Sequence, residues 1–320
     1  MGFFNFFKQS NINQGIEGYK RTAGAVLLDV RTPQEYQEGD AVQVKHYVTG
    51  NDALISLAGP ANKQGRIIAD NICGGDSRYL GSQGSSVIKV FDMIAATTGI
   101  NETNAKKSGL EVDTVILSPM SHAGYYPGGK VMTMKVVFEK DTYRLLGAQI
   151  IGYEGVDKRI DVLATAIHAG LRATQLKDLD LAYAPPYSSA KDPVNMAGFM
   201  IDNIAKGTLK QWHLEDMDKI SKDKNVVLLD VRTVGEFNRG QMKGVNNIPV
   251  DELRERISEI EKGKPVYLIC QSGLRSYIAS RILEGNGYET YNFSGGFRFY
   301  DTVVNDRALI EMAYACGMDY

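Results

Sequence analysis

PVYLICQSGLRS, residues 265–276, decides the fold of the last part of this 320-residue chain. The apolar run at 265–269 has the length and composition of a buried β-strand, and it stops at Cys270. A helix-like stretch begins at Ser276, so the loop joins the carboxyl end of a strand to the start of a helix. Ligands sit at that edge in open α/β sheets. The loop is therefore the first candidate for a functional site.

Strands and helices alternate on both sides of this loop, which predicts a mainly parallel sheet with helices on its faces. The strands are expected at 226–230, 265–269 and 290–293, and the helices at 250–262 and 276–285. The preceding stretch predicts an α+β unit, because strands come first and helices follow. Its strands are expected at 113–118, 131–139 and 145–152, and its helices at 157–169 and 194–204. The predicted fold class is thus α/β and α+β.

Cys270 is the candidate nucleophile of the loop. Gly273 permits a positive φ, and the loop amides together with the positive end of the following helix stabilise an anion. The thiolate is the reactive form of cysteine, and such surroundings favour it. The alternative is a cysteine that only fills the end of a strand. The order of strand, Cys270, Gly273, Arg275 and helix start favours a working site.

Three charged residues, Asp230, Arg232 and Glu236, precede the loop in a half-buried motif. We interpret them as structural support, an ion pair and hydrogen-bond bracket beneath the loop.

Several short motifs link residues 208–320 to one family of sulfurtransferases. They are LLDVR at 228–232, EF at 236–237, Gly244, NIP at 247–249, the loop at 270–275 and SGGF at 294–297. On these residues the segment resembles a single-domain rhodanese. The resemblance implies that Cys270 carries sulfane sulfur as a persulfide and that Arg275 and the loop hold the incoming anion or the persulfide. The loop residues concerned are Gln271, Ser272, Gly273, Leu274 and Ser276. Four residues separate Cys270 from Arg275, whereas related phosphatases have five, so sulfur is favoured over phosphorus.

The middle of the chain carries longer motifs: GPANKQGR at 59–66, GSSVIKVF at 84–91, SHAGYYPG at 121–128, GYEGVDKRID at 152–161 and YAPPYSSAKDP at 183–193. Through them it resembles the C-terminal part of flavin-dependent pyridine nucleotide–disulfide oxidoreductases, in particular coenzyme A disulfide reductases fused to a rhodanese. The resemblance implies a remnant of an FAD-binding domain at 41–105 and a dimerisation domain at 106–207, hence a homodimer. It implies flavin contacts for Asp40 and Ala61. It also implies interface tyrosines, for which Tyr125 and Tyr183 match best and Tyr126 and Tyr187 are the near alternatives.

Other parts of such a reductase are missing from the sequence. No GxGxxG turn occurs anywhere in the chain, although nucleotide-binding domains of this type begin with one. The redox cysteine that the family has near the start of its flavin domain is also absent, and Cys73 ends a predicted helix instead. VLLDVRTPQEYQEG at 26–39 repeats VLLDVRTVGEFNRG at 227–240, so residues 1–40 read as a truncated rhodanese-like fragment. We expect sulfur transfer to need no cofactor and a self-sufficient FAD site not to form.

The composition excludes several other classes of protein. The net charge of −2 and the lack of an apolar run long enough to span a bilayer point away from nucleic acid and membranes. Three cysteines and four scattered histidines predict no metal site and a cytoplasmic location. The first expected function is a sulfurtransferase with a small-molecule sulfur donor and a thiol acceptor, coenzyme A among the candidates. The alternatives are an FAD-dependent NAD(P)H coenzyme A disulfide or persulfide reductase, as a remnant or completed by a partner chain, and a non-catalytic assembly module.

Overall fold

The computed structural model describes residues 43–304, which fall into two units. The repeat at 26–39, Asp40 and Cys316 lie outside the described residues. The first unit comprises a two-stranded antiparallel sheet, β1 (Gln43–Lys45) and β2 (Asp52–Leu54), followed by helix α3 (Ala58–Ile72). No residue of α3 is buried, and Ile68 and Ile72 are 48% and 59% exposed. The predicted helix that ends at Cys73 therefore forms, but the described residues bury no part of it.

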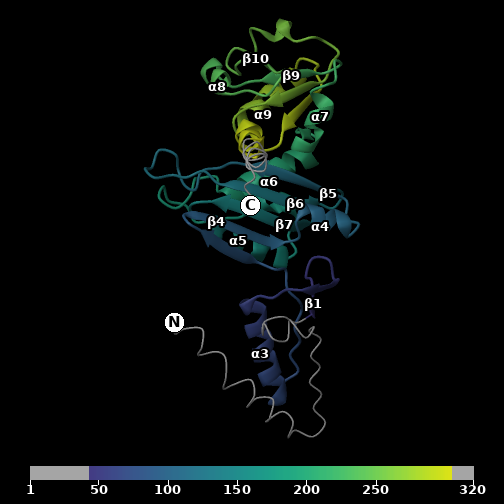
Figure 1. Ribbon diagram of the computed structural model, residues 1–320, viewed down its shortest axis with the longest axis vertical. Coiled ribbons are helices and arrows are strands. Elements are labelled where there is room, and N and C mark those ends of the chain that lie inside the picture. The colour runs from purple at the N-terminus through teal and green to yellow at the C-terminus, as the bar shows by residue number, and fades with distance from the viewer. Residues whose placement is uncertain (1–42, 305–320) are drawn as a thin grey trace, which may run out of the picture. The chain divides into compact units, whose positions relative to one another are not determined.

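The second unit begins with an antiparallel sheet of five strands in the order β3-β4-β7-β6-β5 (Figure 1). The strands are β3 (Ser86–Val90), β4 (Met93–Gly99), β5 (Val112–Leu117), β6 (Thr133–Glu139) and β7 (Leu145–Gly152). The three predicted strands correspond to β5, β6 and β7. The sequence analysis missed β3 and β4.

Helices complete this antiparallel part. They are α4 (Glu102–Lys107), α5 (Val156–His168) and α6 (Pro193–Ala205), with a 3-10 turn at Ala173–Asp178. Helix α5 packs on β4 and β7, while α6 packs on β5, α5 and the 3-10 turn. Apolar residues at helical spacing in α5, Ile160, Leu163 and Ile167, are buried and form its inner face.

A buried ion pair fixes the Pro-rich loop at 182–193. The Arg159 guanidinium donates to Asp192 Oδ2 at 3.0 Å and to the carbonyl oxygen of Ser121 at 3.0 Å, and both charged side chains are at most 3% exposed. Ser188 Oγ donates to the same Asp192 oxygen at 2.7 Å. A buried charge needs such a set of partners. The network therefore holds together the two loops that carry the candidate interface tyrosines.

The last part is a parallel sheet in the order β10-β9-β11-β12-β8, with helices on its faces (Figure 1). Its strands are β8 (Gln211–Trp212), β9 (Val227–Asp230), β10 (Asn246–Asn247), β11 (Val266–Ile269) and β12 (Thr290–Phe293). Its helices are α7 (Met217–Ile220), α8 (Val234–Arg239) and α9 (Leu274–Glu284), with 3-10 turns at Leu214–Asp216 and Ile257–Glu259. The predicted α/β and α+β fold class is confirmed.

The helix predicted at 250–262 is wrong. Only the short 3-10 turn at Ile257–Glu259 forms there, within a series of turns. The Val250 N–H donates to the carbonyl of Val231 at 3.1 Å, which ties the segment to the end of β9, and Leu253 and Ile260 are both buried. Tertiary contacts therefore override a local sequence that has good helix propensity.

Candidate active site

The loop at Cys270 lies where the sequence predicts it, between the end of β11 and the start of α9. Cys270 is 1% exposed, and Gly273 takes a φ of 100° at the N-cap of α9. The Cys270 Sγ accepts hydrogen bonds from the Gly273 N–H at 3.1 Å and from Ser276 Oγ at 3.2 Å. Two donors and a helix start thus face one sulfur atom, an arrangement that stabilises a thiolate.

A turn after β12 is hydrogen-bonded to the backbone of this loop. The N–H groups of Phe297 and Arg298 donate to the carbonyls of Cys270 and Gln271, at 2.8 and 3.2 Å. A Cβ on Gly296 would lie within 2.8 Å of backbone atoms of the loop, and the residue has a φ of 68°. Only glycine meets both conditions. This explains the SGGF motif, which sequence reasoning used only as a mark of resemblance.

Asn292 is a further residue of the site that sequence reasoning missed. Its Nδ2 donates to the carbonyl of Gly273 at 3.1 Å, and its Oδ1 accepts a short hydrogen bond from Ser276 Oγ. Ser276 Oγ also contacts Sγ and the Gly273 carbonyl, but its one proton serves one acceptor at a time. Asn292 therefore influences how often that proton points at the sulfur. The signal that could have identified Asn292 is its position on β12, the strand next to β11 in the sheet.

Arg275 makes a two-pronged ion pair with Glu236. Its Nη1 and Nη2 donate to the two carboxylate oxygens at 2.6 and 2.7 Å. Hydrogen bonding from Arg275, with further bonds from Thr233, lowers the pKa of Glu236 to about 2 despite its partial burial. The pKa of Arg275 is raised, mainly by Glu236 and also by the charge of Cys270. The structure thus brings Glu236 to Arg275 of the loop at Cys270 rather than to the bracket expected beneath the loop.

Asp230 and Arg232 form that bracket without Glu236. Both are 1% exposed, and the Arg232 guanidinium donates to both carboxylate oxygens at 2.7–3.1 Å and to the carbonyl of Gly240 at 2.8 Å. It also stacks over the ring of Phe297, 3.8 Å from its centroid. The pair connects β9, the C-cap of α8 and the turn after β12, and its structural role stays a prediction.

The candidate interface tyrosines lie together on the antiparallel part. Tyr125 and Tyr183 share a hydrogen bond between their hydroxyl oxygens at 2.6 Å, which raises the pKa of Tyr183. All four candidate tyrosines are exposed: Tyr125 by 76%, Tyr187 by 71%, Tyr183 by 46% and Tyr126 by 43%. Exposed rings held on rigid loops are typical of an interface.

Of the two residues predicted to contact a flavin, Asp40 lies outside the described residues and Ala61 lies in helix α3, and both contacts stay predictions. Ala61 lies in the first turn of α3, whose N-cap Leu57 offers no side-chain hydrogen bond. A Cβ added at Gly59 or Gly65 would meet no atom within 4 Å, so there is open space around these two glycines.

No helix in the described range 43–304 is long and apolar enough to cross a membrane. Over the same residues no group of three or more metal-ligating side chains is gathered.

Two sequence families match the chain. Residues 85–193 match "Pyridine nucleotide-disulphide oxidoreductase, dimerisation domain", and residues 213–301 match "Rhodanese-like domain". The chain carries both domains. The resemblance to a coenzyme A disulfide reductase–rhodanese fusion is thereby confirmed. The four domain boundaries proposed from the sequence, and the rhodanese-like fragment at 1–40, stay predictions.

Proteins similar to this chain include some that are named as reductases of coenzyme A disulfide or of persulfides. A coenzyme A disulfide reductase of Staphylococcus epidermidis is 34% identical over 195 residues, covering 61% of this chain and 44% of the relative. The crystal structure of reduced Bacillus anthracis CoADR-RHD superposes with a TM-score of 0.81 at 47% identity, over 84% of this chain and 48% of the other. The structure of an NAD-dependent persulfide reductase from A. fulgidus superposes with a TM-score of 0.75 at 41% identity, over 82% of this chain and 47% of the other. The chain thus spans about half the length of these relatives.

These comparisons correct the expectation about cofactors and favour one of the two enzymatic functions that the sequence allows. The expectation that no cofactor is required, with FAD improbable, is wrong, because the relatives are reductases and one is NAD-dependent by name. Flavin and nicotinamide chemistry is therefore relevant to the family whose dimerisation domain this chain carries. Of the two enzymatic functions that the sequence allows, the comparisons favour coenzyme A disulfide or persulfide reduction.

Proposed function

We propose that this chain takes part in the reduction of coenzyme A disulfides or persulfides, and that Cys270 carries sulfane sulfur for that reaction. The observation that supports the proposal best is the pair of hydrogen bonds that Sγ accepts in the strand-to-helix loop. The rhodanese-like match over residues 213–301 and the persulfide reductase among the relatives agree with it.

The sulfur transfer is a pair of nucleophilic displacements. With thiosulfate as the donor, the Cys270 thiolate attacks the outer sulfur, the S–S bond breaks, and sulfite leaves with its electron pair. An acceptor thiol loses its proton to solvent and then attacks the outer sulfur of the persulfide. That step breaks the new S–S bond and restores the Cys270 thiolate.

Residues of the loop stabilise the charge in both steps. The Gly273 N–H and the Ser276 hydroxyl donate to Sγ in the resting state, and they lie ready for the persulfide. Arg275 uses two of its N–H donors on Glu236, and a guanidinium has five. We propose that a remaining donor faces the loop anion, as the resemblance implies, and that Gln271, Ser272 and Leu274 shape the loop around it.

Reduction requires parts that residues 43–304 do not provide. FAD and a nicotinamide nucleotide would supply the electrons. We propose that they are held by residues outside 43–304 or by a partner chain, with Ala61 and Asp40 contributing from this chain. The dimerisation domain and the exposed tyrosine pair Tyr125 and Tyr183 support assembly as a homodimer.

Cyanolysis tests the sulfur carrier. The protein is treated with thiosulfate, freed of excess donor and exposed to cyanide, and the thiocyanate released is measured. Wild type should release about one equivalent per chain and Cys270→Ser none. Cys73→Ser is the matched control, because Cys73 is an exposed thiol of the first unit and is not part of the loop at 270–276, and it should behave as wild type. Equal release from Cys270→Ser and wild type would refute the assignment.

The visible spectrum tests the reductase part. Flavin absorbance in the purified protein, with NAD(P)H oxidation on addition of coenzyme A disulfide, would support it. A colourless protein that stays inactive after incubation with FAD would show that this chain alone is not a reductase.

A further inference from the structure

One edge of the antiparallel sheet in the dimerisation domain is capped by side chains of the segment that follows α6. Strand β5 ends this sheet and has β6 as its one neighbour within the described residues, and an edge strand leaves backbone N–H and C=O groups without strand partners. The Ile116 N–H donates to Ser294 Oγ at 3.1 Å. The Thr114 carbonyl accepts from Gln211 Nε2 at 3.2 Å. The two sheets, which both belong to the second unit, therefore meet along the edge of β5.

The hydrogen bond between Ile116 and Ser294 is enclosed. Ile116 is 6% exposed and Ser294 is 2% exposed, whereas Gln211 is only partly buried. The Ser294 N–H also donates to the carbonyl of Trp212 in β8 at 3.0 Å, which fixes the backbone that carries the hydroxyl. A buried N–H that loses its acceptor finds no water in exchange. Ser294 is therefore the partner on this edge whose loss the structure compensates least.

The turn that begins at Ser294 supports the sulfur loop, which we define as residues 270–276. A Cβ on Gly296, two residues further on, would lie 2.7–2.8 Å from three backbone atoms of this loop. The N–H of the next residue, Phe297, donates to the carbonyl of Cys270 at 2.8 Å. Close-packed backbone of this kind transmits a displacement rather than absorbing it. A shift at Ser294 would thus reach Cys270 through three further residues of chain.

The position of the loop backbone decides how the sulfur atom is held. One donor to the Cys270 Sγ is the Gly273 N–H at 3.1 Å, and the other is Ser276 Oγ at 3.2 Å, at the start of α9. Hydrogen bonds weaken as distance and alignment become poorer. A small displacement of the loop would therefore reduce the stabilisation of the thiolate, which is the reactive form.

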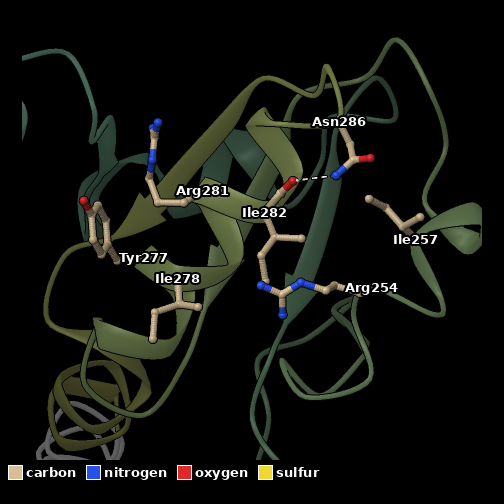
Figure 2. A pocket seen from close by; sticks show the side chains of 7 residues that line it. All are labelled: Arg254, Ile257, Tyr277, Ile278, Arg281, Ile282 and Asn286. Carbon is tan, nitrogen blue, oxygen red and sulfur yellow. Dashed lines mark hydrogen bonds between the residues drawn. The ribbon is translucent and has the colours of Figure 1, made fainter.

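Two other contacts of the same region do not involve the turn after β12. The Gln211 side chain ends on the edge of β5. Arg281 of α9 donates through Nη1 to the carbonyl of Thr208 at 3.1 Å, in the connection that precedes β8. Figure 2 shows the Arg281 side chain extending from α9 at the edge of a hollow that this helix forms with Arg254. Gln211 and Arg281 therefore offer matched controls for Ser294.

We propose that Ser294 is a positioning residue for the sulfur chemistry. By binding the edge of β5, it fixes the turn after β12 and, through that turn, the donors around the Cys270 Sγ. The inference rests on the proposed function, because it concerns the same sulfur carrier. It adds that the dimerisation domain shapes the sulfur site, so that the rhodanese-like domain is not an independent module in this chain.

The pH profile of Cys270 alkylation tests the proposal without any sulfur transfer. The full chain reacts with iodoacetamide over a series of pH values, and mass spectrometry follows the peptide that contains Cys270. Ser294→Ala should move the midpoint of the profile about one unit to higher pH, because weaker donation to Sγ disfavours the thiolate. It should also slow the thiosulfate loading of Cys270 near neutral pH about 10-fold. Ser294→Thr keeps the hydroxyl oxygen and should follow wild type in both measurements.

The controls separate positioning from a general loosening of the region. Gln211→Ala removes the other contact on the edge of β5, and Arg281→Met removes the contact with Thr208. Both should lower the melting temperature without moving the midpoint of the pH profile.

The charged groups around the loop stay the same in every variant. They are the ion pairs of Arg275 with Glu236 and of Arg232 with Asp230. A shift of the midpoint is therefore not caused by a change of charge.

Three results would overturn the proposal: a midpoint that Ser294→Ala leaves unchanged, an equal shift in Gln211→Ala, or a shift in Ser294→Thr as large as that in Ser294→Ala. Ser294→Cys, with a weaker acceptor, provides the same test if Ser294→Ala does not fold, and it should shift the midpoint in the same direction. Failure of wild type to load sulfur, with the midpoint shift intact, would refute the sulfur transfer but keep the positioning role.

Discussion

The loop at Cys270 and helix α3 both carry strong family motifs, yet only the loop lies in packed surroundings. Sγ accepts two hydrogen bonds, and the loop is held by the turn after β12. Helix α3 has no buried residue, and the glycines of its motif touch nothing. The comparison teaches that a motif yields a site only where the same chain supplies the residues that surround it. The sulfur chemistry proposed for this chain therefore rests on residues that the structure describes, whereas the predicted flavin contacts rest on Ala61 in α3 and on Asp40, which lies outside the described residues.

The buried bracket gives the largest expected effect on stability. Arg232→Met would leave Asp230 unpaired in the interior, so we expect the free energy of unfolding to fall by about 3–5 kcal/mol. Urea denaturation measures it. The control is Arg256→Met, which removes exposed ion pairs with Glu252 and Glu259 and should leave the free energy of unfolding nearly unchanged, because solvent screens such pairs. Similar losses in both variants would mean that the region around the loop is no better packed than the surface.

The donors to Sγ are expected to affect the rate at which Cys270 takes up sulfur. Ser276→Ala removes one of the two donors to Sγ. Asn292→Ala removes the acceptor that competes with Sγ for the Ser276 proton, together with a donor to the Gly273 carbonyl. We expect Ser276→Ala to slow the thiosulfate loading of Cys270 about 10- to 100-fold. Ser280→Ala is the control, because its hydroxyl donates to the Tyr277 carbonyl in the same helix. Equal rates in the two serine variants would contradict the role of Ser276.

The Arg275–Glu236 pair predicts a pH dependence. The pKa of Glu236 falls from 4.5 to about 2 on folding, so the pair stabilises the folded state above pH 4.5 and loses this effect as the pH falls from 4.5 to 2. Glu236→Gln keeps the capping pattern of α8 but removes the charge. We expect it to cost about 1 kcal/mol near neutral pH and progressively less in acid. A difference from wild type that stays constant between pH 7 and pH 3 would contradict the pairing.

The smallest effect is expected in α3. Ile68→Asn and Ile72→Asn change side chains that are about half exposed, so each should alter the free energy of unfolding by less than about 0.5 kcal/mol. Leu283→Ala in α9, at a fully buried position, should cost about 2–5 kcal/mol. Comparable losses in α3 and α9 would show that a partner covers the apolar face of α3, which would break the contrast between the two regions.

The sequence was sufficient wherever one local signal dominated. The apolar runs of β7, β11 and β12, the glycine-bounded α5 and the cysteine loop were predicted to within about two residues, because burial, length and breaker residues agree there. The helix predicted at 250–262 failed because its propensity competes with contacts to β9. Strands β3 and β4 were missed because β3 lies at a sheet edge with four of its five residues exposed.

Only part of the candidate site could be predicted from the sequence, because some of its contacts join distant segments. Cys270, Gly273 and Ser276 share one short segment, so their proximity follows from the chain itself. Asn292 and the Glu236–Arg275 pair come from residues 16 and 39 positions away from their partners, and only the sheet order brings them together. The charged motif alone could not show that Asp230 pairs with Arg232 whereas Glu236 pairs with Arg275.

Peptide mapping after thiosulfate treatment tests the central claim most directly, because it locates the added sulfur atom. The protein is loaded, digested without reductant and analysed by mass spectrometry, with the peptides of Cys73, Cys270 and Cys316 compared. The account predicts one additional sulfur on the Cys270 peptide and none on the other two. Sulfur spread over all three thiols, or absent from Cys270, would contradict it.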